Sequence, residues 1–533
     1  MSGLNRSRGT MAVSSGKWYY EVWMKYQHHG SNAFGIREVG GNAIIANDTN
    51  ANFINVGHPV GSGVQYNLSV NGSQSTGGEV GSVSDGDIIG VMFDVDAQTI
   101  SFKSNNSEIH SSLTNLDYSA CSNMETVAPF ISVGGGRDAI VNFGQDSSFA
   151  GFKTSQGNQD GNDIGDFYYT PPSGFLALCT SNLPDATVVP SENFNTVLYT
   201  GNESGQSIDV GFQPDWVWMK SRSEAHGNAV IDSVRGVNAN WLYTNTADDE
   251  FSEEDNQISF DSDGFNLLTG YNISNDSGQS YVAWNWKANG SGSSNTNGDI
   301  TSTVSANVDS GFSIVGWSGT GSAATIGHGL SKKPEMIMVK RRNANEMGWR
   351  VFHDANAANY HLVLDTTGAR ASSSSIFNNT EPTASLFTVG SGGSVNNSSG
   401  TYIAYCFHSV DGYSKVGSYV GNGRTGATGQ GPFVNLGFRP AYIMIKRSSS
   451  SSAYTNWVIY DSKRDGFNQN AENSGGNKYV YADSSSAEAN TYILNTFSNG
   501  FTIYDNYDVF NSSGQTYIYL AFAETPFKYS NAR

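Results

Sequence analysis

Short hydrophobic runs, separated by glycine, asparagine and serine, recur along the whole chain of 533 residues. Runs such as 88–93, 216–219 and 442–445 are too short for ordinary helices, and turn-forming residues flank them. Glycine alone accounts for 61 residues. The pattern therefore predicts an all-β protein in which short strands alternate with turns.

One block recurs three times, at 211–222, 329–341 and 435–447. In each copy a glycine and a proline precede a hydrophobic run that ends in lysine. A second run ending in aspartate follows, and then an aromatic strand that begins at Tyr281, Tyr402 or Tyr517. Repeated landmarks in one order predict three copies of one β-rich, sandwich or jelly-roll-like domain of about a hundred residues.

These landmarks divide the chain into six parts. The N-terminal region and a connector come first, and the three copies follow, with a Gly/Ser/Asn-rich linker expected after the first copy. The expected ranges, in chain order, are 1–152, 153–190, 191–287, 288–310, 311–412 and 413–533.

The N-terminal region has its own strand motifs: G-K-W-Y-Y-E-V from Gly16, D-G-D-I-I-G-V-M-F-D from Asp85, T-I-S-F-K-S-N from Thr99 and V-N-F-G from Val141. Together they resemble a SPRY (B30.2-like) domain. This resemblance implies a bent β-sandwich that binds protein or peptide through loops at one edge. The strands that usually precede the first motif are short or missing, so we expect another segment or a partner to complete that edge.

Composition argues against several classes of partner and site. The formal net charge is −19, and charged residues make up 14% of the chain. This balance argues against nucleic acid as a partner, because phosphate binding needs basic patches. No hydrophobic run approaches the length of a membrane span, so membrane insertion is not expected. The three cysteines (Cys121, Cys179 and Cys406) lie far apart and have no metal-ligand spacing.

The motifs that could carry chemistry favour structural interpretations. The G-x-G-x-x-G of 421–426 precedes no helix, so a turn is the better interpretation. Adjacent His28 and His29 point apart on an extended chain. The acidic segments 248–255 and 261–264 suit a solvated loop and a turn better than a Ca²⁺ site. We therefore expect no cofactor, no metal and no enzymatic activity, although a pair of carboxylates for glycoside cleavage is invisible in sequence.

A second resemblance covers the rest of the chain. The connector motif P-P-S-G-F-L-A-L-C-T-S-N-L-P, the three repeats and the terminus at 521–533 resemble bacteriophage virion proteins, especially tail-fibre or adhesion proteins of marine phages and cyanophages. The resemblance implies a virion component that contacts other virion proteins and a host surface glycan or protein. It also implies a homo-oligomer, with a trimer as the usual fibre form. Alternatives are an architectural part, such as a capsid decoration or tail-assembly protein, and a surface-glycan depolymerase.

The segments that differ most between the copies are 238–256, 355–380 and 465–490. Loops on a rigid β scaffold are common recognition sites, and exposed aromatic residues give large contact area. We expect receptor contacts here, with the third copy at the distal tip. The candidate receptor-binding residues are Trp241, Tyr243, Tyr360, His361, Tyr479 and Tyr481.

The repeated charges have a structural interpretation. Lys220, Lys340 and Lys446 each end one hydrophobic run, and Asp232, Asp354 and Asp461 each end the next. We expect each lysine to pair with its aspartate across a hairpin, because opposite charges on neighbouring strands stabilise a sheet.

Overall fold

The structure is a computed structural model, and it confirms the all-β prediction: 44% of the residues are in strands and 4% in helices. It describes residues 5–8, 11–25, 32–38, 53–58, 65–70, 73–76, 83–84, 86–119, 127–133, 138–183, 186–237, 241–251, 258–268, 271–424, 431–452, 455–465, 476–491, 493–504 and 507–526.

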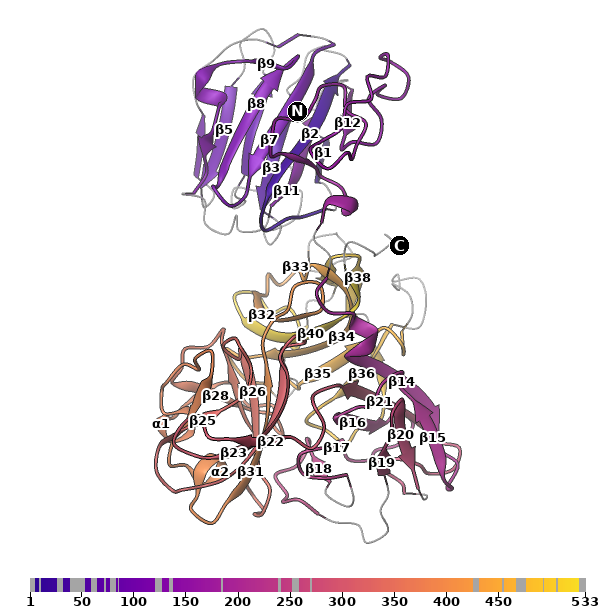
Figure 1. Ribbon diagram of the computed structural model, residues 1–533, viewed down its shortest axis with the longest axis vertical. Coiled ribbons are helices and arrows are strands. Elements are labelled where there is room, and N and C mark those ends of the chain that lie inside the picture. The colour runs from indigo at the N-terminus through magenta and orange to yellow at the C-terminus, as the bar shows by residue number, and fades with distance from the viewer. Residues whose placement is uncertain are drawn as a thin grey trace. The chain divides into compact units, whose positions relative to one another are not determined.

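The chain forms two compact units (Figure 1). The first comprises Met1–Asp185 together with Pro432–Asn435, which holds β33 (Phe433–Asn435). The second comprises Ala186–Gly431 and Leu436–Arg533. Each unit is described by itself below.

The first unit is a β-sandwich of two antiparallel sheets. One sheet has the order β1 (Asn5–Arg8), β11 (Val127–Val133), β3 (Asn32–Glu38), β4 (Phe53–His58), β5 (Gln65–Val70) and β6 (Ser73–Thr76). The other has the order β10 (Leu116–Asp117), β8 (Thr99–Ser104), β7 (Ile88–Asp94), β2 (Lys17–Met24) and β12 (Ala139–Asn142), with β9 (Ser107–Glu108) on β8 and β13 (Leu176–Ala177) on β2. Alternate residues of β2, among them Trp18, Tyr20 and Val22, enter the core between the sheets.

Two features complete this unit. The N-terminal edge carries a strand of the chain itself, because β1 pairs with β11. The connector is ordered, because two buried carboxylates fix it to the sandwich. Glu21 of β2 accepts hydrogen bonds from the backbone N–H groups of Tyr168 (2.9 Å) and Tyr169 (2.8 Å). Asp160 accepts one from the backbone of Ala177 (2.8 Å), so the Gly/Asn-rich turn before it is ordered.

Three groups of strands in the second unit share one order, and we call them lobes 1, 2 and 3 (magenta, orange and yellow in Figure 1). Lobe 1 has β14 (Phe194–Thr200), β21 (Ser280–Trp286), β16 (Trp216–Ser221), β17 (Ala229–Asp232) and β18 (Leu242–Tyr243). Lobe 2 has β24 (Phe312–Ser318), β31 (Thr401–Phe407), β26 (Met336–Arg341), β27 (Arg350–His353) and β28 (Tyr360–Val363). Lobe 3 has β32 (Ser414–Val420), β40 (Thr516–Pro526), β34 (Phe438–Arg447), β35 (Val458–Asp461) and β36 (Asn477–Tyr481).

Smaller elements complete the lobes. A small sheet accompanies each large one: β15 (Gln206–Asp209), β20 (Gly264–Leu267) and β19 (Ile258–Phe260) in lobe 1, β25 (Ala324–Gly327) and β30 (Leu386–Val389) in lobe 2, and β38 (Leu494–Phe497) and β39 (Gly500–Ile503) in lobe 3. Further short elements are β22 (Ser293–Asn295), β23 (Ser302–Asn307), β29 (Ala371–Ser372), β37 (Ala489–Thr491), α1 (Ser374–Phe377), α2 (Gly393–Asn396), η1 (Ser111–Leu113), η2 (Thr180–Asn182) and η3 (Pro190–Glu192).

The register shows which residues correspond. Trp216, Met336 and Tyr442 lie opposite Trp286, Phe407 and Phe522, respectively, on the aromatic strand of the same lobe. These three residues therefore occupy one position of the common sheet, and the aromatic strand is the second strand in each lobe.

The lobes share a single core and are not separate tandem domains as expected. Trp216 of lobe 1 stacks on Tyr405 of lobe 2 with ring centroids 4.3 Å apart. Phe194 of lobe 1 stacks on Phe522 of lobe 3 at 4.9 Å. One cluster of buried side chains contains residues from all three lobes. The cause is visible in β16, whose six residues are all buried, because one face meets the small sheet and the other meets the neighbouring lobes.

The expected linker at 288–310 is also structured. It contains β22 and β23, and β23 pairs along the outer edge of β24 in lobe 2. Gly290, Gly292 and Gly298 have positive φ angles, so they form the turns around these strands. A Gly/Ser/Asn-rich composition is typical both of flexible linkers and of short strands joined by tight turns, and here the second interpretation holds.

Replacing Trp216 with alanine tests the shared core. The side chain is 1% exposed and contacts rings of two lobes. We expect Trp216→Ala to lower the free energy of unfolding of the second unit by about 3–5 kcal/mol, with lobes 1, 2 and 3 unfolding together in one denaturant transition. The matched control, Val308→Ala at a side chain that is 42% exposed, is expected to change it by less than about 0.5 kcal/mol. Separate loss of lobe 1 would contradict the prediction.

Candidate functional site

Each lobe inserts a loop into a neighbour, and a buried lysine holds it. Lys340 Nζ of lobe 2 donates to the Ala247 carbonyl of lobe 1 at 3.1 Å. Lys446 of lobe 3 donates to Thr367 of lobe 2 at 2.9 Å, and Lys220 of lobe 1 donates to Ser485 of lobe 3 at 3.0 Å. The three contacts close a ring of lobes. Burial lowers the pKa of each lysine to about 8.

The expected lysine–aspartate pairs are therefore wrong. In the antiparallel hairpin, Trp216 lies opposite Asp232 and Met219 lies opposite Ala229. The lysine that ends β16 and the aspartate that ends β17 consequently lie at opposite ends of the hairpin. The lysines have a structural role, but their partners are backbone carbonyls, one in the same lobe and one in the next lobe.

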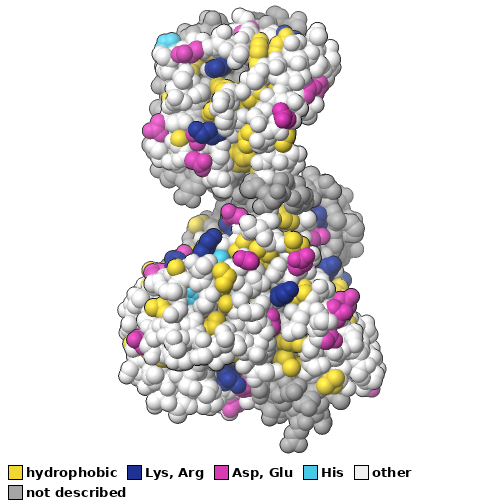
Figure 2. Space-filling view, viewed as in Figure 1, with side chains coloured by type: hydrophobic (Ala, Val, Ile, Leu, Met, Phe, Trp, Pro, Cys, Tyr) yellow, Lys and Arg dark blue, Asp and Glu magenta, His cyan; other side chains and the backbone are white. Residues whose placement is uncertain are grey.

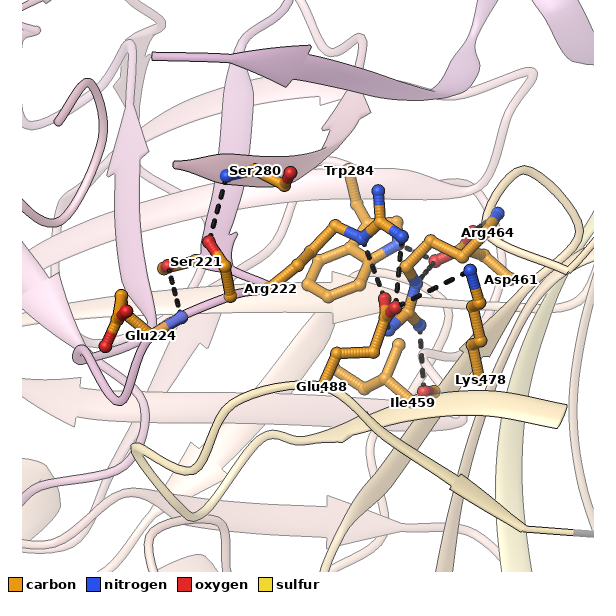
Figure 3. Close-up of polar contacts among 11 residues, drawn as sticks. Ser221, Arg222, Glu224, Ser280, Trp284, Ile459, Asp461, Arg464, Lys478 and Glu488 are labelled. Carbon is orange, nitrogen blue, oxygen red and sulfur yellow. Dashed lines mark hydrogen bonds and ion pairs between the residues drawn. The ribbon is translucent and has the colours of Figure 1, made fainter. Parts of the chain in front are cut away.

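The contact between lobes 3 and 1 is a buried charged cluster (Figure 3). Arg464 and Asp461 form an ion pair at 2.6 Å, and both side chains are 0% exposed. Trp284 of lobe 1 donates from Nε1 to the same carboxylate at 3.0 Å. Glu488 accepts from Nε of Arg222 of lobe 1 at 2.7 Å and lies 3.6 Å from Arg464. Two carboxylates and two guanidinium groups thus compensate one another across the contact.

The contact between lobes 1 and 2 repeats this arrangement. Asp232 pairs with Arg235, and Tyr405 of lobe 2 donates to Asp232 at 2.8 Å. Glu250 accepts from Arg235 at 2.9 Å and from Arg342 of lobe 2 at 2.8 Å. Both carboxylate–arginine pairs belong to an Asp-Ser-x-Arg sequence, at 232–235 and 461–464. That repeated motif is the sequence signal which would have located the cluster.

The contact between lobes 2 and 3 lacks the buried Asp–Arg pair. His353, which is opposite Met336, takes the place of Asp232 and Asp461. Asn356 takes the place of the arginine and accepts from Arg370 at 2.9 Å. Burial lowers the pKa of His353 to about 4. Asp354, the residue expected here, is instead a half-exposed partner of Lys333.

The six candidate receptor residues lie at the fifth strands of the large sheets, where we expected loop tips. Trp241 is 0% exposed and His361 is 8% exposed, so neither offers a contact surface. Half-buried Tyr243 stacks on Phe251 at 4.7 Å, and Tyr360 packs against Arg370 at 4.8 Å. These strands are buried because they hold the lobes together: the Tyr243 carbonyl, for example, accepts from Trp349 of lobe 2 at 2.8 Å.

Tyr479 and Tyr481 differ from the other four because they line a pocket of about 330 Å³ in lobe 3. Their rings meet edge to face at 5.3 Å. Burial, followed by the hydrogen bond with Tyr479, raises the pKa of Tyr481. The remaining lining residues are Thr491, Tyr507, Val509 and Phe510. Tyr507 is 60% exposed, and sequence comparison missed it because it lies outside the segments that differ most between the copies.

The other motifs behave as turns or structural charges where they are described. Gly421 and Gly423 lie in a loop after β32, and Gly423 has φ 68°, while Thr425 and Gly426 lie outside the described residues. Asp261 accepts from Asn266 at 2.6 Å in the turn before Gly264. His28, His29 and the second half of the acidic segment also lie outside the described residues. Within the described ranges, no cluster of three or more His, Cys, Asp or Glu side chains could hold a metal ion.

Figure 2 shows how sparse the charges are on the visible face, where Ser, Thr, Asn, Gln and backbone atoms dominate and Lys, Arg, Asp and Glu occur singly or in small groups. This agrees with a chain of 14% charged residues that uses several of its charges in buried pairs. Among the described residues, no helix is long and apolar enough to cross a membrane.

Comparison with known families now places both units. The SPRY domain family matches residues 17–146, so the first unit contains a SPRY domain, as its motifs predicted. The family described as "Domain of unknown function (DUF7483)" matches residues 189–526. The chain belongs to this family. The DUF7483 match begins at η3 and ends at the last residue of β40, so it spans all three lobes as one block.

Solved structures give weak similarities. The SPRY domain of human HERC1 is 17% identical, with 26% of this chain and 82% of that chain covered and a TM-score of 0.21. Sheep galectin-11 in complex with glycerol is 12% identical, with 26% and 97% covered and a TM-score of 0.16. A search of curated proteins finds no match to this DUF7483 chain.

The charged cluster predicts a specific pattern of variant stabilities. Asp461→Ala leaves the buried Arg464 without its nearest counter-charge and is expected to lower the free energy of unfolding by about 3–5 kcal/mol. The double variant Asp461→His with Arg464→Asn copies His353 and Asn356 of lobe 2, so we expect it to be clearly more stable than the single variant. Denaturant titration measures both. A double variant as unstable as the single one would contradict the equivalence of the contacts.

Acid should weaken the contact between lobes 2 and 3. His353 binds a proton near pH 6.5 when unfolded but near pH 4 when folded, so its contribution falls as the pH drops through this window. Between pH 7 and pH 4.5 we expect it to remove roughly 2–3 kcal/mol from the free energy of unfolding. Over the same pH range, the free energy of unfolding of His353→Gln should fall by roughly 2–3 kcal/mol less than that of the wild type. Equal losses in both proteins would contradict this assignment.

Proposed function

We propose that this protein is a non-enzymatic recognition protein, an adhesin of the tail-fibre type on a bacteriophage virion, and that lobe 3 contacts a host surface glycan. The observation that carries the proposal is the tyrosine-lined pocket of lobe 3. Its volume of about 330 Å³ lies at the lower end of the range for small-ligand sites.

The side chains of the pocket suit a sugar ring. Tyr479, Tyr481 and Tyr507 offer aromatic faces for the apolar side of a pyranose, and their hydroxyl groups can hydrogen-bond its hydroxyls. Tyr479 and Tyr481 belong to β36, which is paired on both sides by β35 and β37. This side of the site is therefore held on a paired strand before any ligand binds, which reduces the entropic cost of recognition.

The position of the carboxylates supports binding without catalysis. Glycoside hydrolysis needs two carboxyl groups about 5–9 Å apart beside the substrate. Among the described residues, the lining of the tyrosine pocket contains no Asp or Glu. Asp461 and Glu488, which converge at the contact between lobes 3 and 1, are each paired with an arginine. Each has a structural task that a change of protonation would disrupt.

The virion assignment is supported by the sequence resemblance of 171–184 and of the three repeats to phage fibre proteins. The closed ring of lobes supplies within one chain the threefold arrangement that fibres usually obtain from three chains. In this proposal the SPRY domain contacts other virion proteins, as its resemblance to peptide-binding modules implies.

The test is binding of the purified full chain to immobilised bacterial surface polysaccharides. Tyr507→Ala is expected to weaken binding about tenfold, corresponding to the loss of one stacking contact. The matched control is Phe497→Ala on β38, whose ring is 40% exposed and does not line the pocket. Equal binding by the wild type and Tyr507→Ala would refute the site. Shortening of the bound polysaccharide would refute the non-enzymatic assignment and favour a depolymerase.

Antibody labelling of intact particles tests the location. A label on the tail agrees with an adhesin. A label spread over the capsid would contradict this and make the protein an architectural part of the virion.

A further inference from the structure

Lobe 1 contains an open groove between its two sheets. The groove has a volume of about 480 Å³ and is lined by residues 195–199 of β14, residues 207–209 of β15 and Lys463. Both strands are the outermost of their sheets in the described part of the chain. Their outer backbone edges therefore border the groove together.

The corresponding place in lobe 2 is occupied by the chain itself. The register makes β24 the equivalent of β14 and β25 the equivalent of β15. The segment 298–307 runs between them in an extended conformation. Its second half, β23, pairs antiparallel with β24 from Ser302↔Trp317 to Asn307↔Phe312. Its first half bonds to β25, because the N–H groups of Asp299 and Ile300 donate to Thr325 O at 2.9 and 3.1 Å.

The side chains of this segment fill the interior of lobe 2. Ile300, Ser302 and Val304 lie on one side of the extended chain and are 5%, 3% and 7% exposed. Beneath them, Val315 is 0% and Trp317 is 5% exposed. Ile300, Val304, Val315 and Trp317 belong to one hydrophobic cluster.

In lobe 1 the same interior positions lack this cover. Val197 and Tyr199 correspond to Val315 and Trp317, and both are half-buried although they also pack on a hydrophobic core. The stacking beneath is preserved: Tyr199 lies on Tyr281 at 5.2 Å, as Trp317 lies on Tyr402 at 5.3 Å. The groove is thus the binding surface of a strand that lobe 2 provides and lobe 1 does not.

We propose that the groove of lobe 1 accepts an extended segment of a partner polypeptide, which adds antiparallel to β14 and bonds to the edge of β15 at Ser207. Ser207 is the equivalent of Thr325, whose N–H and hydroxyl hold the carboxylate of Asp299 at 2.9 and 2.8 Å. Addition of a strand to an exposed edge is a common form of peptide recognition, with main-chain bonds for affinity and alternate side chains for specificity.

The chemistry of the partner segment follows from segment 298–307. The partner segment should carry small or β-branched apolar residues at the positions that Ile300, Val304 and Ala306 occupy in segment 298–307. Like that segment, it should contain no proline. An acidic residue at the position of Asp299 is favoured, because the backbone N–H of Ser207 stands where that of Thr325 donates to the Asp299 carboxylate in lobe 2. The groove lining itself carries one cation, Lys463, and one anion, Asp209. This partner is distinct from the glycan proposed for lobe 3. The proposal for either site can therefore be refuted while the other stands.

The probe is a labelled synthetic peptide with the sequence of residues 298–307, titrated into the full-length chain and followed by fluorescence anisotropy. We expect saturable binding, with hydrogen–deuterium exchange slowed at 195–199 and 206–209. Val197→Arg should weaken binding at least about tenfold. The control Val420→Arg, at a 59%-exposed valine of the equivalent strand β32, should leave it unchanged.

Two further measurements separate loss of peptide binding from misfolding of the protein variant and from self-association. Peptides carrying Val304→Asp or Asp299→Lys should bind at least about tenfold more weakly than the peptide of residues 298–307. This measurement uses the wild-type protein, so it does not depend on the folding of a protein variant. Sedimentation velocity without peptide should give the same assembly state for the wild type and for Val197→Arg. Absence of binding, binding without protection of β14 and β15, or a dimer broken by Val197→Arg would overturn the proposal. The last result would identify the occupant as a second copy of the chain.

Discussion

The second unit depends on burial of its large sheets from both faces. In each lobe the third strand and the aromatic strand carry hydrophobic residues on both sides, so a single small sheet cannot cover them. The remaining face is covered when three lobes meet around Trp216, Tyr405, Phe522 and their neighbours. Such a core exists only when all three lobes are present, because each supplies part of the cover of the other two. The DUF7483 match across all three lobes fits this dependence.

A core of this size still needs polar groups at its margin, where the loops cross from lobe to lobe. Lys220, Lys340 and Lys446 supply donors for loop carbonyls that would otherwise be buried without partners. Two of the three contacts add a compensated set of carboxylates and arginines. Lobe 2 replaces its set with His353 and Asn356, so the ring combines two charged contacts with one in which the carboxylate–arginine pair is missing. A buried ion pair is costly to break, which favours one arrangement of the lobes over others.

Much of the fold was predictable because the repeated landmarks specify strands and their order. The SPRY motifs predicted the N-terminal sandwich, and the block that recurs three times, with its aromatic strand, predicted the recurring sheet. Three things were not predictable from spacing. The Lys220–Asp232 pair was expected because both residues end strands, but consecutive antiparallel strands end at opposite edges. The segment 288–310 has the composition of a linker, yet its Ile300 and Val304 fill lobe 2. Trp241 lies in a variable polar segment but is fully buried, because composition does not show which way a side chain points. Of the candidate site, Tyr479 and Tyr481 were expected at an exposed loop tip but lie on β36, where they line the pocket, and Tyr507 becomes their neighbour only through the tertiary fold.

A closed ring of lobes gives this DUF7483 protein a rigid scaffold whose lobes diverge at their margins: an aromatic pocket on lobe 3 and an open strand groove on lobe 1. The central claim is that the three lobes fold and open as one body. Native-state hydrogen exchange of the backbone amides of β21, β31 and β40 tests it most directly. The account predicts that the slowest amides of all three strands share one free energy of opening and one dependence on denaturant. Exchange of β40 through a separate, lower-energy opening, with β21 and β31 still protected, would contradict it.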